Sequence, residues 1–179
     1  MPRENKRRFL ASRLPPAEPR AETMIRQVYW RLGNGWCLRL RREGQPDEAP
    51  RDTIALKGPR TRSTRVQYDW TLPAEPDLSD EERTATVAAL FRAGGSHRIV
   101  KSRRSYLLDG QLWGVDEFHW ENSGLIIAEL ELQDPGELRR VRVPSWCLRE
   151  ITADTDFDGE SLAFHPYAHS LSAPGPRSR

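Results

Sequence analysis

Residues 124–132 read Gly-Leu-Ile-Ile-Ala-Glu-Leu-Glu-Leu, and this stretch decides the fold class. In a β-strand, side chains point to alternate faces of the sheet with a period of two residues. Read as a strand, the stretch places Glu129 and Glu131 on one face, whereas Ala128 and Leu130 lie on the other. It therefore predicts a strand with one charged and one apolar face.

The same alternation recurs along the chain with charges of both signs. The sets that share a face are Glu4, Lys6 and Arg8; Arg39 and Arg41; Arg65, Gln67 and Asp69; and Lys101 and Arg103. An ordinary half-exposed sheet, with its charges toward water, explains any one of these strands. A closed barrel with a wet, charged lumen explains their recurrence, and it also predicts a ligand, because buried charges are costly unless they are paired. Periodicity alone leaves both interpretations open.

Strands are predicted for most of the rest of the chain, and helices are few. The predicted strands span 4–9, 24–32, 35–42, 52–58, 64–72, 98–108, 111–118, 124–132 and 147–153. Short glycine turns at 32–35 and 108–110 favour antiparallel hairpins.

One helix is indicated within residues 79–94. Ser79 and Glu82 have the spacing of a capping box, which satisfies free amides at a helix start. Gly94-Gly95 supplies the stop. A second, short helical turn is expected near Gly159–Phe164.

Length and composition restrict the class of protein. The 179 residues suit one domain, expected over 1–170, with a disordered tail at 171–179. A net charge of +2 provides no strong field for nucleic acid or an anionic membrane, and no apolar run approaches the length of a membrane span. Cys37 and Cys147 lie far apart in the sequence, with neither metal-ligand spacing nor a disulfide framework, so a cytoplasmic location is expected.

The order of motifs resembles the CYTH superfamily, also called the triphosphate tunnel metalloenzymes. The motifs that carry the resemblance are Glu4-Asn5-Lys6-Arg7-Arg8, Gln27-Val28-Tyr29, Arg39-Leu40-Arg41, Leu56-Lys57-Gly58, Lys101-Ser102-Arg103, Trp113-Gly114-Val115-Asp116-Glu117-Phe118, residues 124–132, Pro144-Ser145-Trp146 and Glu150-Ile151-Thr152-Ala153-Asp154. The resemblance implies an α+β, mainly antiparallel fold: a closed eight-stranded β-barrel, or tunnel, with a few flanking helices.

The resemblance also implies a function and a set of site residues. The tunnel is expected to bind a triphosphate or polyphosphate group and to hydrolyse it with Mg²⁺ or Mn²⁺. The implied phosphate-binding residues are Arg39, Arg41, Lys57, Lys101 and Arg103; the implied metal ligands are Glu4, Glu129 and Glu131; and the implied catalytic residues are Arg8 and Lys57. The expected partner is a small anion, such as inorganic triphosphate, a nucleoside triphosphate or thiamine triphosphate, and neither nucleic acid nor a membrane.

Two departures from the family pattern fall in its opening motif. Lys6 stands where the family has its second glutamate, and Arg8 stands where it has a lysine. Lys6 replaces a metal ligand with a cation, and the guanidinium of Arg8 does not lose its proton as an ammonium can. The alternative hypothesis is therefore a non-catalytic module that binds a polyphosphate or nucleotide with an impaired metal site.

Overall fold

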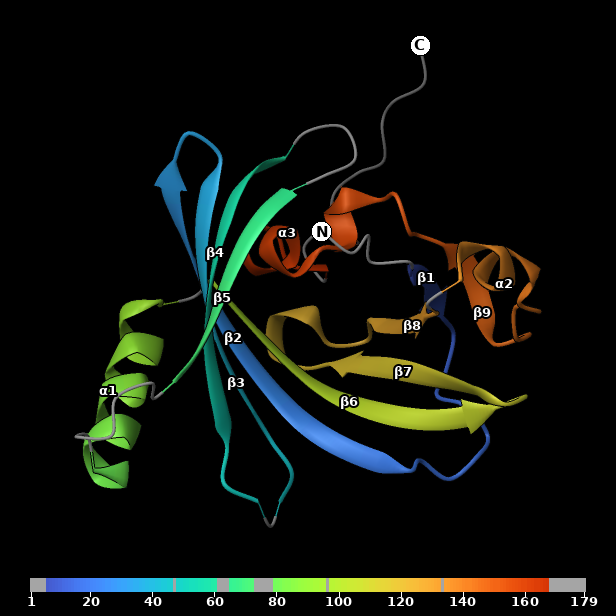
Figure 1. Ribbon diagram of the computed structural model, residues 1–179, viewed down its shortest axis with the longest axis horizontal. Coiled ribbons are helices and arrows are strands. Elements are labelled where there is room, and N and C mark those ends of the chain that lie inside the picture. The colour runs from blue at the N-terminus through green and yellow to red at the C-terminus, as the bar shows by residue number, and fades with distance from the viewer. Residues whose placement is uncertain are drawn as a thin grey trace. The chain divides into compact units, whose positions relative to one another are not determined.

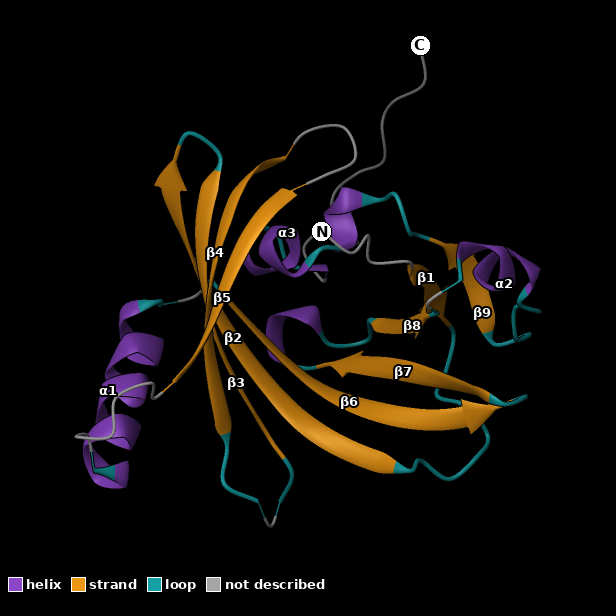
Figure 2. Ribbon diagram, viewed as in Figure 1, coloured by secondary structure: helices purple, strands orange, loops and turns teal. Residues whose placement is uncertain are grey.

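A computed structural model describes residues 6–46, 48–60, 65–72, 79–95, 97–132 and 134–167, and strands dominate it (Figures 1 and 2). The strands are β1 (Lys6–Ala11), β2 (Ala21–Gly33), β3 (Trp36–Gly44), β4 (Arg51–Arg60), β5 (Arg65–Leu72), β6 (Arg98–Leu108), β7 (Gln111–Phe118), β8 (Ile126–Glu131) and β9 (Cys147–Glu150). The helices are α1 (Asp80–Ala93), α2 (Pro135–Arg140) and α3 (Gly159–Phe164), with short 3-10 turns η1 (Trp120–Asn122) and η2 (Thr155–Phe157).

The mainly antiparallel α+β class is confirmed. Hydrogen bonds define the strand order β5-β4-β3-β2-β6-β7-β8-β1-β9, and every pairing with a known register is antiparallel. This order begins at β5 and ends at β9, so hydrogen bonds do not close it among the described strands. The closed barrel therefore stays a prediction.

The chain divides into two compact units. We call Met1–Thr23 with Lys101–Arg179 the terminal unit, and Met24–Val100 the middle unit. The single domain expected over 1–170 also stays a prediction. Glu4 and the expected tail at 171–179 lie outside the described residues.

In the middle unit, α1 packs on the apolar face of the strands. Val28 of β2, Leu40 of β3 and Val87 of α1 are buried together, and Ile54 and Phe91 pack against them. Val28 pairs with Leu40, and Leu40 with Ile54, so strand alternation brings these side chains to one face. The same face also carries the ion pair between Arg42 and the buried Asp52, whereas Arg39, Arg41 and Lys57 lie on the opposite face.

The ends of α1 follow the signals in the sequence. The Ser79 hydroxyl accepts a hydrogen bond from the Glu82 amide, and the Glu82 carboxylate accepts one from the Ser79 amide, as the capping box predicts. Gly95 has a φ of +59°, which favours glycine. Gly94 has an ordinary helical φ, but a Cβ at this position would overlap a methyl carbon of Val28. Gly95 therefore allows a left-handed backbone after the helix, whereas Gly94 leaves room for the Val28 side chain.

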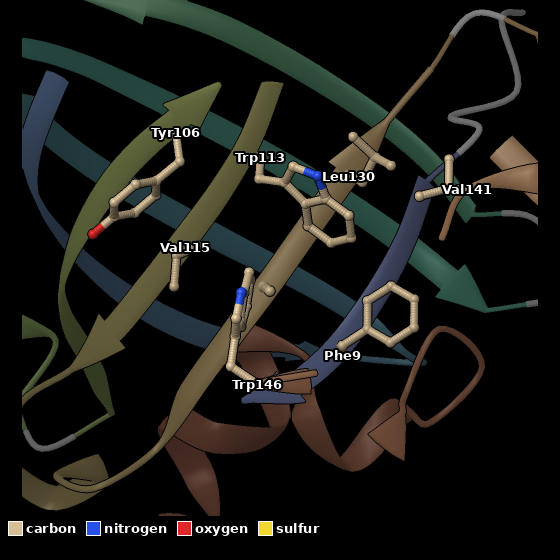
Figure 3. Packing of buried hydrophobic residues seen from close by; sticks show 8 residues of the cluster. Phe9, Tyr106, Trp113, Val115, Leu130, Val141 and Trp146 are labelled. Atoms are coloured by element: carbon tan, nitrogen blue, oxygen red, sulfur yellow. The ribbon is translucent and has the colours of Figure 1, made fainter. Parts of the chain in front are cut away.

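In the terminal unit, one face of the strands is an aromatic core (Figure 3). The ring of Trp113 lies 6.0 Å from that of Phe9 and 5.9 Å from that of Trp146, measured between centroids. Tyr106, Val115, Ala128, Leu130 and Val141 complete the buried cluster. All the strand residues of this core belong to the apolar set of the alternation, so the charged set takes the opposite face.

The helix α2 and the end of β9 differ from the prediction. α2 follows Asp134, whose carboxylate accepts a hydrogen bond from the Gly136 amide, and its Pro135 lies at a helix start. It has about one and a half turns, too few for a helical period to be recognised in the sequence. β9 ends at Glu150 rather than at 153, whereas α3 occupies the predicted stretch.

Among the described residues, no helix is long and apolar enough to cross a membrane.

The substitution Gly94→Ala should destabilise the protein by roughly 1–3 kcal/mol, because the added methyl overfills the contact between α1 and β2. Urea-induced unfolding measures the loss. Gly58→Ala is the control, since a Cβ there meets the Trp36 ring at 3.4 Å, near ordinary contact distance. Equal losses in the two variants would contradict the role assigned to Val28.

Candidate functional site: two charged sheet faces

The charged face of the terminal unit is organised around Asp116. The β6–β7 register places Asp116 opposite Arg103, and its carboxylate accepts hydrogen bonds from Arg103 Nε and a terminal nitrogen, both at 2.6 Å. The Lys101 ammonium donates to the same carboxylate at 2.5 Å. Asp116 is only 1% exposed. It therefore holds two of the predicted phosphate-binding residues in one buried cluster.

Arg103 extends this cluster to the next strand. It donates to Glu129 of β8 at 2.6 Å. Gly114 lies beside it on β7, where a Cβ would meet Arg103 Nε at 3.7 Å. Gly114 therefore lies along the path of the guanidinium across β7 to β8, where a methyl group would make ordinary contact with it.

Arg8 joins Glu129 to the segment that precedes α3. The β1–β8 register places Arg8 opposite Glu129, and Arg8 Nε donates to that carboxylate at 3.1 Å. Its terminal nitrogens donate to Asp158 at 2.9 Å and to the carbonyl of Phe157 at 2.7 Å. Arg8 is 7% exposed. These contacts fit a residue that positions others, and the catalytic role predicted for Arg8 stays a prediction.

The network keeps its carboxylates ionised. Burial by itself would raise the pKa of Asp116, but Lys101 and Arg103 outweigh it and lower that pKa to about 2. Burial likewise opposes ionisation of Glu129, and the nearby Arg103, Lys101 and Arg8 lower its pKa. Burial lowers the pKa of Lys101, and Asp116 opposes that effect. Asp116 and Arg8 are almost fully buried and paired on this face, whereas Glu131 is exposed and the Arg103 side chain is 30% exposed, so both interpretations of the alternation stay open.

The sequence prediction did not assign a role to Asp116, although it lies within the motif 113–118. A usable signal exists in the turn at Asp109-Gly110, where both residues have positive φ. This two-residue turn pairs Leu108 with Gln111, and the same register continues to Arg103 and Asp116.

In the middle unit, the predicted cations lie on the face opposite α1. Cross-strand pairing places Arg41 opposite Thr53, Arg39 opposite Ala55, and Lys57 opposite Cys37 and Gln67. Strand alternation then aligns these residues on one face, as predicted. Cys37 follows the same alternation and is buried there as a free thiol.

The arginines of this face are only partly paired. A terminal nitrogen of Arg41 bonds Glu43 on the same strand, and one of Arg39 reaches Asp69 at 3.5 Å. Nε of each arginine is buried and has no hydrogen-bond acceptor among the described residues. A buried donor without a partner is costly, and a bound water or a ligand oxygen would satisfy it.

The predicted metal ligands do not form a described cluster. Glu129 and Glu131 share the charged face of β8, as the alternation predicts. Glu131 is exposed and lies opposite Lys6 in the β1–β8 register. Glu4 lies outside the described residues. Within the described ranges, no group of three His, Cys, Asp or Glu side chains is placed to hold a metal ion.

The substitution Asp116→Asn should destabilise the protein by about 3–5 kcal/mol, because it removes the counter-charge of the nearly buried Lys101 and one of the two carboxylates that Arg103 contacts. Unfolding in urea at neutral pH measures the loss. Glu117→Gln, at the next position of β7, is the matched control. Glu117 pairs with Arg104 on the other face and is more exposed, so its loss should stay below about 1 kcal/mol.

Acid should lower the free energy of unfolding of the parent protein more than that of the Asp116→Asn variant. The pKa of Asp116 falls from an ordinary 3.8 to about 2 on folding. The contribution of Asp116 to the free energy of unfolding is therefore fully present above its pKa in the unfolded chain, and it is lost as pH falls through its pKa in the folded protein. Urea midpoints between roughly pH 5 and 2 measure this difference. Parallel curves for parent and variant would contradict the assignment of a depressed pKa to Asp116.

Comparisons with known proteins identify relatives. The chain is 31% identical over 114 residues to an inorganic triphosphatase of Acetivibrio thermocellus, an alignment that covers 64% of the chain and 66% of that protein, just under two thirds. It is 31% identical over 120 residues to an inorganic triphosphatase of Nitrosomonas europaea, covering 64% of the chain and 78% of that protein. No family model matches the chain.

A solved structure shares the fold. The crystal structure of the inorganic triphosphatase NE1496 superposes with a TM-score of 0.65 at 24% identity, covering 98% of this chain and 99% of that chain. With the relatives and the described motifs, this likeness agrees with the resemblance seen in the sequence. The chain therefore belongs to the CYTH superfamily, the triphosphate tunnel metalloenzymes.

Proposed function

We propose that this protein binds inorganic triphosphate through its two charged sheet faces and hydrolyses it to phosphate and diphosphate. The observation that carries the proposal is the pair of buried Nε atoms of Arg39 and Arg41, which have no acceptor among the described residues. Phosphate oxygens are strong acceptors and match the planar fork of a guanidinium. The names of both relatives support triphosphate as the substrate. Nucleoside and thiamine triphosphates remain predictions of the resemblance.

The closed tunnel is part of this proposal. The middle unit offers Arg39, Arg41 and Lys57 to phosphate oxygens, and the terminal unit offers Lys101 and Arg103. The family membership and the shared fold support the closed tunnel. In hydrolysis, water oxygen bonds to a terminal phosphorus, the bridging P–O bond breaks, diphosphate leaves, and a proton passes to solvent. The cations stabilise the charge that accumulates on the phosphate oxygens, and we assign Lys57 to this task at the leaving oxygen.

The divalent metal implied by the family does not fit the described carboxylates as they stand. Mg²⁺ and Mn²⁺ need several carboxylate or water oxygens around them. Both oxygens of Asp116 accept bonds from Arg103, and those of Glu129 are divided between Arg8 and Arg103. Glu131 lies across from Lys6. Metal dependence therefore stays a prediction of the resemblance, and we route no step through the metal.

A second candidate is a binding module without catalysis. The same engagement of Asp116 and Glu129 by cations favours it, because carboxylates held as counter-ions are not available to activate water. Both candidates use the same phosphate-binding residues. They differ only in whether triphosphate is turned over.

Triphosphate binding should weaken by roughly 10-fold or more in Arg39→Ala and in Arg41→Ala, since each loses charged hydrogen bonds to phosphate. Titration calorimetry with sodium triphosphate measures this, and affinity should fall as salt rises. Arg26→Ala is the control, because Arg26 is exposed on the opposite face of β2. If all three variants bind like the parent, the charged face of the middle unit is not the site.

Phosphate release separates the two candidate functions. Parent protein is incubated with inorganic triphosphate, ATP and thiamine triphosphate, each with Mg²⁺, with Mn²⁺ and with chelator. We expect release from inorganic triphosphate that Lys57→Ala reduces more than it reduces binding. Tight binding without release under every condition would establish the binding module instead.

A further inference from the structure

We infer that this protein captures free triphosphate without a resident divalent metal ion, and that Asp116 and Glu129 serve as counter-ions of its cations rather than as metal ligands. The inference rests on the proposed function and deepens it, because it names the form of the substrate that is bound. It comes from the hydrogen-bond partners of the carboxylates and of the cations on the two charged faces.

Asp116 is committed to cations on both of its oxygens. Each oxygen accepts a bond from Arg103, and one also accepts from Lys101. The carboxylate is 1% exposed and the Lys101 side chain is 12% exposed, so solvent offers Lys101 little in place of this carboxylate. A metal ion that took Asp116 would leave Lys101 nearly buried beside a second positive charge, and would take one of the two carboxylates that Arg103 contacts. This arrangement opposes metal binding at Asp116.

Glu129 is committed in the same way by two arginines. One oxygen accepts from Arg8 and the other from Arg103. Arg8 is fixed in turn by Asp158 and by the carbonyl of Phe157. Its guanidinium cannot turn away from Glu129 without breaking those bonds, so Glu129 is held as the shared counter-ion of two fixed cations.

The third carboxylate on this face has a cation as its cross-strand partner. Glu131 pairs with Lys6 in the β1–β8 register. A positive charge at Lys6 repels a divalent ion from the same edge of the sheet, and cross-strand neighbours lie about 5 Å apart, close enough for this repulsion to act. None of the described carboxylates on this face therefore offers an uncommitted pair of oxygens away from a cation.

The arginines of the middle unit provide a second observation in favour of a metal-free anion. Among the described residues, the buried Nε donors of Arg39 and Arg41 have no acceptor. Their cross-strand neighbours carry no charge: Ala55 and Thr53 on β4, and Tyr29 and Gln27 on β2. A free triphosphate carries enough negative charge to satisfy such donors directly. A bound metal would cancel part of that charge and weaken the attraction. The cations of the middle unit are therefore suited to the metal-free anion.

The test is calorimetric titration of the full protein with sodium triphosphate, once with chelator and once with Mg²⁺. We expect binding in chelator, with an affinity that Mg²⁺ raises by less than about fivefold, the lower limit of ordinary coupling between ligands. Binding that appears only with Mg²⁺ overturns this inference and leaves the proposed function standing. No binding under either condition overturns the proposed function itself.

Mn²⁺ provides a readout that does not depend on turnover. Electron paramagnetic resonance of Mn²⁺ with the protein alone should show only the free ion. Glu129→Gln should bind triphosphate in chelator at least as tightly as the parent, because one competing negative charge is removed from Arg103. Glu117→Gln, on the opposite face, should leave that affinity unchanged. A bound Mn²⁺ signal in the parent that Glu129→Gln abolishes would overturn the counter-ion role.

Discussion

The buried carboxylate of Asp116 is the constraint on which the charged face of the terminal unit depends. The carboxylate is almost closed to water and accepts hydrogen bonds from Lys101 and Arg103, and burial of Lys101 would be costly without it. From Asp116 the ion pairs continue through Arg103 to Glu129, and from Glu129 to Arg8. Three neighbouring strands, β6, β7 and β8, are thus joined to β1 by side chains as well as by backbone hydrogen bonds.

The two units differ in what lies across from their arginines. In the terminal unit, Arg103 pairs with Asp116 and Arg8 pairs with Glu129, so each charge meets its opposite on the next strand. In the middle unit, Arg39 lies across from Ala55, whose methyl group cannot accept a hydrogen bond. Cross-strand partners contribute most to the pairing of sheet side chains. The terminal unit therefore places a carboxylate directly across from each of these two arginines, whereas Arg39 and Arg41 have only uncharged cross-strand neighbours and, among the described residues, each keeps an Nε without an acceptor.

Much of the fold was predictable because strand alternation and turn chemistry are local. The period-two pattern placed Arg39 with Arg41, and Glu129 with Glu131, on common faces, and the capping box placed α1. Closure of the barrel does not follow from such signals, since alternation specifies faces and not which end strands meet. The assignment of Glu129 as a metal ligand had the same weakness. Its two arginine partners come from β1 and β6, which the local pattern of β8 does not reveal.

Arg8 shows how a departure from a family motif can change the use of a position. A lysine there would present a compact ammonium on a flexible stem, whereas the guanidinium presents donors along several fixed directions. Arg8 uses them for Glu129, Asp158 and the Phe157 carbonyl together. Asp158 lies 150 positions away in the chain, at the residue that precedes α3. The exchange thus gives up a group that can lose a proton, and it gains an anchor between the charged face and the C-terminal segment.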